Sequence, residues 1–85
     1  MVRTIGIEPD PAKRLRTRQG KAIRDTRKLR GMTHADLAEA VGVTEGAVRH
    51  WEEGRYAARQ HHQVKIASAL GVPWGVLFSL DGEAA

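Results

Sequence analysis

Basic side chains are concentrated in one part of this 85-residue sequence and could bind a polyanion. Between Lys13 and Arg30 there are nine Lys or Arg residues against the single acid Asp25. Such a localised basic segment is expected of a polyanion binder. A solvated helix face gives the same pattern, so the charge run alone leaves both interpretations open. The residues expected to form a basic arm on the polyanion are Lys13, Arg14, Arg16, Arg18 and Lys21.

A second set of polar residues lies in the segment VTEGAVRHWEEG, residues 43–54. Its spacing predicts a short helix that begins after Thr44 and buries Val48 and Trp51 on one side. A short helix with one apolar and one polar side is suited to present the polar side to a partner. The polar side carries Glu45, Gly46, Arg49 and His50.

If this helix meets DNA, these four residues differ in what they could recognise in a groove. Arg49 is the best candidate for reading guanine, because a guanidinium can bond O6 and N7 together. His50 could donate to a base or a phosphate, or could be an ordinary exposed side chain. Glu45 suits the positive end of a helix, and in the groove it accepts only from a donor such as cytosine N4. Gly46 would let the backbone approach closely while reading little itself.

The elements that must position these residues read as five helices and no strand, which predicts an all-α fold. Gly31 ends a first helix over residues 18–30. Residues 10–17 are either a helical extension or an arm that orders on a partner, because Gly20 weakens a continuous helix. After a loop over residues 55–62, two more helices are expected. The four later helices are predicted from the Thr33 cap to Gly42, from the Thr44 cap to Gly54, over 63–71 and over 73–80.

The requirements of a helix-turn-helix are met by two of these helices, the one predicted to begin at Thr33 and the one predicted to begin at Thr44. Ala38 is small where the helices must touch, Gly42 can turn left-handed, and Val48 can lock the second helix onto the first. No one of these residues is specific, but the set in register with two helix caps is a strong signal. The apolar stripes expected inside the bundle also include Leu29 and Val64.

The segments GKAIRDTRKLRGMTHADLAEAVGVTEGAVRHWEEGR and IASALGVPWGVLF resemble the Cro/C1-type (Xre-like) helix-turn-helix family of phage repressors and bacterial regulators. The resemblance implies a compact five-helix lambda-repressor-like domain, with its third helix in the major groove and usually a dimer on a two-fold operator. It covers residues 18–80. Residues 1–17 would then form the basic arm or extension, which we expect to follow the duplex backbone or minor groove, and residues 81–85 a tail.

The resemblance also implies roles for individual residues. Arg27 and Glu52 match a buried ion pair that holds the third helix at its angle, a structural role. Glu45, Gly46, Arg49 and His50 match the positions that face the groove. The positions that match contacts to the DNA backbone are Thr33, His34, Thr44, Arg55 and Arg59.

Other classes of function find little support in the sequence. There is no Cys, and the four His residues lack ligand spacing on one helix face, so we expect no metal site. We find no nucleophile paired with a base, and we expect no enzymatic activity, no cofactor and no small-molecule ligand. No apolar run approaches the length of a membrane span, so we expect a cytoplasmic protein, from a bacterium or one of its phages.

The sequence therefore predicts a regulator that binds double-stranded DNA and acts by occupying an operator. An antitoxin that also binds a protein toxin is the main alternative, and binding of RNA is a third. A homodimer through Trp74, Val76, Phe78 and the loop after the third helix is one expectation. The same residues could instead close the core of a monomer.

Overall fold

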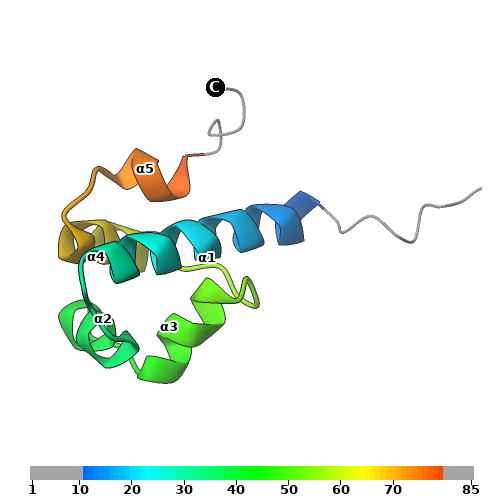
Figure 1. Ribbon diagram of the computed structural model, residues 1–85. Helices are drawn as coiled ribbons and strands as arrows, with labels where there is room; N and C mark the ends of the chain where they lie inside the picture. The colour runs from blue at the N-terminus through cyan, green and yellow to red at the C-terminus, as the bar shows by residue number, and fades with distance from the viewer. Residues whose placement is uncertain (1–10, 80–85) are drawn as a thin grey trace, which may run out of the picture.

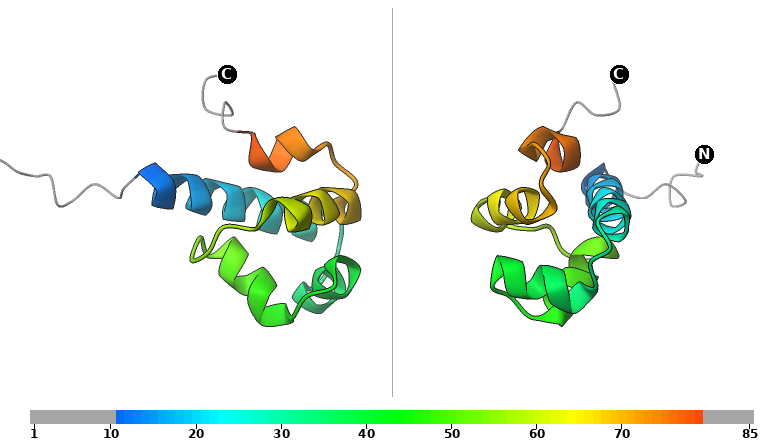
Figure 2. Two further views of the ribbon diagram at one scale, coloured as in Figure 1. Left: turned by 180° about the vertical axis from the view of Figure 1, so that it is seen from behind. Right: turned by 60° about the vertical axis from the view of Figure 1, so that its left-hand side comes forward.

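Five helices make up residues 11–79, the part of the chain that the computed structural model describes, and this part contains no strand. Helix α1 crosses the whole molecule, with α2 and α3 on one side of it and α5 on the other (Figure 1). Seen from behind, α4 runs alongside α1 (Figure 2). The helices are α1 Pro11–Leu29, α2 His34–Val41, α3 Glu45–Glu52, α4 Gln60–Leu70 and α5 Trp74–Phe78.

Helix α1 is continuous over 19 residues and extends the helix expected over residues 18–30 toward the N-terminus, although Gly20 lies within it. Of the two alternatives for the residues before position 18, those from Pro11 onward form a helical extension. Gly20 is buried, and a Cβ atom built on it would lie 2.3 Å from the carbonyl oxygen of Trp51. Gly20 is therefore a point of close approach between α1 and α3, and this contact compensates for the poor helix propensity of glycine.

The caps predicted for α2 and α3 are present. The Thr33 hydroxyl accepts a bond from the Asp36 backbone N–H at 3.0 Å, while the Asp36 carboxylate accepts one from the Thr33 backbone N–H at 2.9 Å. Gly42 ends α2 with φ 88°, a left-handed conformation that glycine adopts without strain. The Thr44 hydroxyl then caps α3 by accepting from the Ala47 backbone N–H at 3.1 Å. This short capped turn determines the angle between the two helices.

The core lies between the five helices and includes Leu37, Ala38, Val41, Val48, Trp51, Ile66, Leu70, Leu77 and Phe78. Two predictions about it were wrong. Leu29 is 83% exposed and Val64 is 57% exposed, because each points away from the neighbouring helices. Phe78, expected in a dimer patch, is only 2% exposed and closes the core under α5.

Helix α4 begins three residues earlier than predicted, so the loop before it covers residues 53–59 and both His61 and His62 are helical. Its other end is fastened to α1. The Arg30 guanidinium donates from Nε to the Leu70 carbonyl at 2.9 Å and from Nη2 to the Gly71 carbonyl at 3.4 Å. A cation at these carbonyls also suits the negative end of α4.

Candidate nucleic-acid interface

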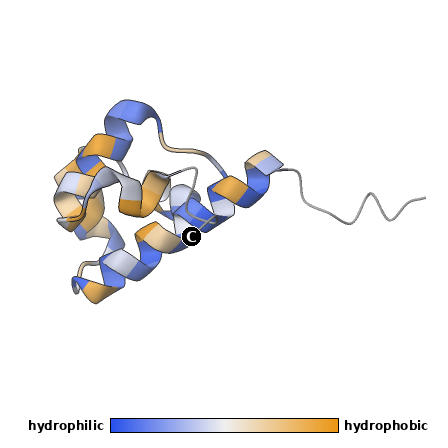
Figure 3. Ribbon diagram, turned by 90° about the horizontal axis from the view of Figure 1, so that it is seen from above, coloured by the Kyte–Doolittle hydropathy of each residue, from blue (hydrophilic) through white to orange (hydrophobic). Residues whose placement is uncertain are grey.

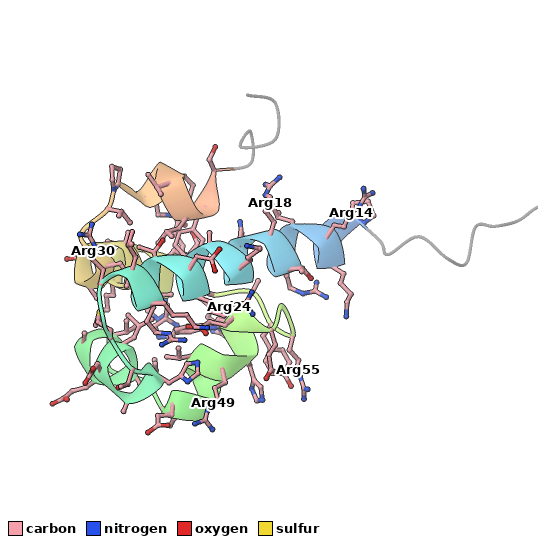
Figure 4. All side chains as sticks on the ribbon, in the orientation of Figure 1. Arg14, Arg18, Arg24, Arg30, Arg49 and Arg55 are labelled. Carbon is pink, nitrogen blue, oxygen red and sulfur yellow. The ribbon has the colours of Figure 1, made fainter. Side chains whose placement is uncertain are left out.

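Helix α3 has one side in the core and one side open to solvent. Val48 is fully buried and Trp51 is 7% exposed, so these two side chains attach the helix to the bundle. Glu45, Gly46 and Arg49 lie on the open side. In Figure 4 the Arg49 side chain points away from the bundle at the outer edge of the molecule. The open side can therefore enter a groove without any change of fold.

Arg49 and Glu45 form an ion pair across one turn of the open side. Nη2 of Arg49 lies 3.2 Å from Oε1 of Glu45, and the two side chains are about half exposed. An acid four residues before a base is the favourable order on a helix, and the acid also faces the positive end of α3. The principal base-reading candidate is thus already oriented by another of the candidates.

Gly46 has no structural reason to be glycine. The only atom within 4 Å of a Cβ built on it is the Thr44 hydroxyl oxygen, at 3.8 Å, and its φ is not positive. A glycine inside a helix costs about 0.5–1 kcal/mol relative to alanine. The missing side chain leaves the first turn of α3 bare beside Glu45, so a partner could approach its backbone closely.

His50 is less available than the sequence indicated, because its ring packs against Tyr56. The two ring centroids are 5.2 Å apart with the planes at 79°, an edge-to-face contact. Tyr56 itself is 59% exposed, in the loop after α3. The sequence reasoning missed this residue, since a single tyrosine in a loop without periodicity carries no signal.

The expected pair of Arg27 and Glu52 lies in the interior, where both residues are 6% exposed. The Arg27 guanidinium donates from Nε to Oε2 of Glu52 at 2.7 Å and from Nη2 to Oε1 at 3.2 Å. It also donates to the Met32 carbonyl at 2.8 Å. One guanidinium thus connects α1, the start of the helix-turn-helix and the end of α3.

His34, expected at the DNA backbone, takes part in this interior cluster instead of projecting freely. Its Nε2 lies 3.0 Å from Oε1 of Glu52 and 3.2 Å from Nη2 of Arg27. The start of α2 also has its own acid, because the Asp36 carboxylate already bonds the Thr33 N–H. The positive end of α2 is therefore partly compensated before any phosphate arrives.

A hollow of about 200 Å³ opens beside this cluster and is lined by Arg24, His34, Arg49, Glu52 and Glu53. Arg24 comes from α1, and Figure 4 shows its side chain on the side of α1 that faces α3. The sequence reasoning counted Arg24 in the basic segment but did not assign it to the site. Its position one turn before the buried Arg27 on the same helix was the available signal.

The residues expected to form a basic arm do not share one direction. Nε of Arg16 donates to the Gly54 carbonyl at 3.1 Å, and Nη2 of Arg18 donates to the Ser79 carbonyl at 3.3 Å. Lys21 bonds Asp25 at 2.8 Å. In Figure 4 Arg14 and Arg18 point to the side of α1 on which α5 lies, away from α3. Lys13 is exposed on the first turn of α1.

Arg55 and Arg59, the two loop candidates, are both exposed. Arg55 lies 3.6 Å from Glu53 at the end of α3, and Figure 4 shows it on the same side of the molecule as Arg49. Arg59 immediately precedes α4 and occupies its N-cap position. Thr44 is exposed, but its hydroxyl is engaged as the cap of α3.

Two apolar residues of α5, Trp74 and Val76, are exposed. They are 44% and 59% exposed. The indole N–H of Trp74 donates to Oε1 of Gln63 at 3.0 Å, which fixes the ring against α4. Along α1, in contrast to α5, most residues are hydrophilic (Figure 3).

Within residues 11–79 no group of three or more His, Cys, Asp or Glu residues is arranged to hold a metal ion. The imidazole rings of His61 and His62 lie next to each other, with their centroids 4.1 Å apart. Partial burial lowers the pKa of His62, and the nearby His61, Lys65 and Arg59 lower it further. None of the described helices is both long enough and apolar enough to span a membrane.

Comparison with known proteins agrees with this geometry. Residues 23–77 match the model of the HTH_3 helix-turn-helix family. An uncharacterized HTH-type transcriptional regulator of Methanothermobacter thermautotrophicus is 45% identical over 49 residues, 58% of this chain and 71% of the relative.

Two solved structures are also similar. The clp gene regulator ClgR from C. glutamicum has a TM-score of 0.73 and 33% identity, over 92% of this chain and 97% of its own. The restriction-modification controller protein C.AhdI from Aeromonas hydrophila has a TM-score of 0.72 and 25% identity, over 74% of this chain and 96% of its own. The chain belongs to the helix-turn-helix family, and it is a DNA-binding transcriptional regulator.

Proposed function

We propose that this regulator inserts α3 into the major groove of an operator and represses transcription by occupying that site. The observation that carries the proposal is the open side of α3, where Arg49 is exposed and aimed outward while Val48 and Trp51 hold the helix to the core. Arg49 reads guanine, and Gly46 allows the backbone of α3 to come close to the base edges. The names of ClgR, a gene regulator, and C.AhdI, a controller protein, support regulation as the role.

The DNA backbone is held by cations that share the side of α3. Arg24 and Arg55 lie on that side together with Arg49, whereas Arg14 and Arg18 point toward α5 (Figure 4). We therefore assign the phosphate contacts first to Arg24 and Arg55. In the alternative, a basic arm, all basic residues of α1 would contact phosphates alike.

Salt dependence tests the assignment, because each phosphate contact that is lost reduces the slope of log K against log salt by about 0.9. Replacing Arg24 and Arg55 with Gln should weaken binding to operator and random DNA alike and reduce the slope by about 2. Arg14→Gln is the matched control, with the same loss of charge per site on the other side of α1. An equal effect per residue from Arg14→Gln would contradict the assignment and favour the basic arm.

A homodimer through the exposed apolar residues of α5 fits the same function. Trp74 and Val76 are exposed there, and Trp74 is fixed in place by Gln63. A second copy would cover these apolar side chains and present two recognition helices to a two-fold operator. Val76→Lys should give a monomer in sedimentation and weaken operator binding. Leu29→Lys, at a still more exposed aliphatic residue on α1, should do neither. A wild-type protein that sediments as a monomer on and off DNA would refute the dimer.

Selection of bound sites from random duplex DNA is the direct test of the function. We expect a short palindromic consensus that contains guanine, and Arg49→Ala should lose it while retaining binding to random DNA. Binding without any consensus would refute operator recognition. A small partner protein that co-purifies with the chain and covers α3 would instead favour an antitoxin.

A further inference from the structure

Only one ion pair on the open side of α3 is available to contact DNA bases. Gly46 has no side chain to offer, and the His50 ring is engaged by Tyr56. On the open side of the first two turns, the charged atoms that remain are those of Glu45 and Arg49, 3.2 Å apart. These two side chains must therefore carry most of the direct sequence information of the helix.

We propose that Glu45 and Arg49 read a single G·C base pair as one unit, with Arg49 on the guanine and Glu45 on its cytosine. This inference rests on the proposed function of α3 as the recognition helix. In the major groove a G·C pair presents two acceptors, guanine N7 and O6, and then one donor, cytosine N4. The ion pair presents the complementary order, two N–H donors of the guanidinium and then a carboxylate acceptor.

Both side chains have enough capacity to bond each other and the base pair at once. A guanidinium carries five N–H donors, and only one hydrogen of Nη2 is used by Glu45. A carboxylate has about four acceptor sites, so it can accept from Arg49 and from cytosine N4 together. The unit is formed before binding, so little side-chain freedom is lost when it meets the base pair.

The other base pairs do not match this array. An A·T pair places the adenine amino group where the second guanidinium donor lies and sets thymine O4, an acceptor, against the Glu45 carboxylate. A C·G pair in the reversed orientation sets the cytosine amino group against Arg49. Each mismatch sets donor against donor or acceptor against acceptor, so a side chain that has given up water finds no base partner, which is costly.

Glu45 should also weaken binding to random DNA, whereas it strengthens binding to the operator. A carboxylate at the leading edge of α3 repels phosphates on every sequence, and only the cytosine amino group compensates for this. Removing it should raise the affinity for random DNA while lowering the preference for the operator. Glu45 is in this sense a residue that both positions Arg49 and determines specificity.

The test begins with selection from a randomised duplex pool by the wild type and by Glu45→Ala. The wild type should select a G·C pair with fixed orientation, and Glu45→Ala should accept other pairs at that position and bind random DNA more tightly. Asp25→Ala is the matched control, because it removes an exposed acid from another pair of this spacing, with Lys21, on α1. It should leave the selected sequence unchanged.

Base analogues in the selected site then test each contact separately. Replacing the cytosine with 2-pyrimidinone removes only the 4-amino group, and the wild type should lose about fivefold or more in affinity, the low end for one good base contact. Glu45→Ala should be indifferent to this change. Replacing the guanine with 7-deazaguanine removes N7, to which Arg49→Ala should be indifferent.

These experiments distinguish the joint reading by Glu45 and Arg49 from the role of α3 as the recognition helix. Equal loss by the wild type and Glu45→Ala on 2-pyrimidinone would overturn the joint reading, as would unchanged site selection by Glu45→Ala. The recognition role of α3 would still stand in either case if 7-deazaguanine affects only proteins that retain Arg49. Equal loss by wild type and Arg49→Ala on 7-deazaguanine would remove the proposed function itself.

Discussion

Two helical glycines should respond to alanine with opposite signs, because only one of them lies at a helix contact. At Gly20 a Cβ atom would lie 2.3 Å from the Trp51 carbonyl oxygen and 2.6 Å from that of Glu52. At Gly46 the nearest atom is a hydroxyl oxygen at 3.8 Å. Neither glycine has a positive φ, so backbone strain does not enter the comparison.

The change in the free energy of unfolding for each variant can be estimated from these distances. Alanine in place of glycine inside a helix gains about 0.5–1 kcal/mol of stability, and this should be the whole effect of Gly46→Ala. At Gly20 the atoms in conflict are backbone atoms, which a rotamer change cannot relieve. Ordinary contact begins at 3.4 Å, so α1 and α3 must separate by about 1 Å. Overpacking of this kind costs about 1–3 kcal/mol or more, which exceeds the gain in helix propensity.

Urea denaturation followed by circular dichroism measures both free energies of unfolding. We expect Gly20→Ala to lose about 1–2 kcal/mol net and Gly46→Ala to gain up to about 1 kcal/mol. A Gly20→Ala protein as stable as the wild type would refute the close approach of α1 and α3. Gly46→Ala should also bind DNA more weakly despite its greater stability, since the added methyl group lies on the open side of α3. Unchanged DNA affinity of this variant would refute a close approach of that backbone to DNA.

Two further predictions concern a buried and a partly buried polar group, Arg27 and His62. Arg27→Met should lower the free energy of unfolding by about 3 kcal/mol, because it leaves the buried Glu52 carboxylate with His34 in place of two guanidinium bonds. Adding Glu52→Leu should recover most of the loss in urea denaturation. A double variant no more stable than Arg27→Met would contradict this explanation. Burial lowers the pKa of His62 below its ordinary value of 6.5, so the unfolded chain binds more protons than the folded one near that pH. The free energy of unfolding should therefore fall as the pH drops below 6.5, and His62→Gln should flatten that part of the stability curve; an unchanged slope would refute the assignment.

The local signals in the sequence predicted the helix-turn-helix well. Caps act through bonds between residues three apart, so Thr33 with Asp36 and the Thr44 hydroxyl could be recognised without knowing the fold. Gly42 could be recognised for the same reason, because a left-handed link between two short helices favours glycine. The resemblance to a family further implied the pair of Arg27 and Glu52, which no local pattern would have indicated.

What the sequence could not predict depends on contacts between distant segments. Helix propensity alone argued against a continuous α1 through Gly20, and only the carbonyl groups of α3 explain why glycine stands there. Periodicity assigned Leu29 and Val64 to the core, but which side of a short helix is covered depends on its neighbours. The edge-to-face contact of His50 with Tyr56 was likewise invisible, because it joins α3 to a loop without a pattern.

The residues around α3 divide into those that set its position and those that face outward, and the two groups should affect DNA binding differently. Gly20, Arg27 and Glu52 determine where the helix lies relative to α1, and none of them is exposed on the open side. A change in any of them moves every outward side chain together, so affinity for all sequences should fall with little change of consensus. Glu45 and Arg49 leave the position of the helix unaltered, so their substitution should change the consensus while the fold and the salt dependence from phosphate contacts persist. A substitution at Gly20 that altered the consensus, with the protein still folded, would show that the position of α3 itself carries sequence information.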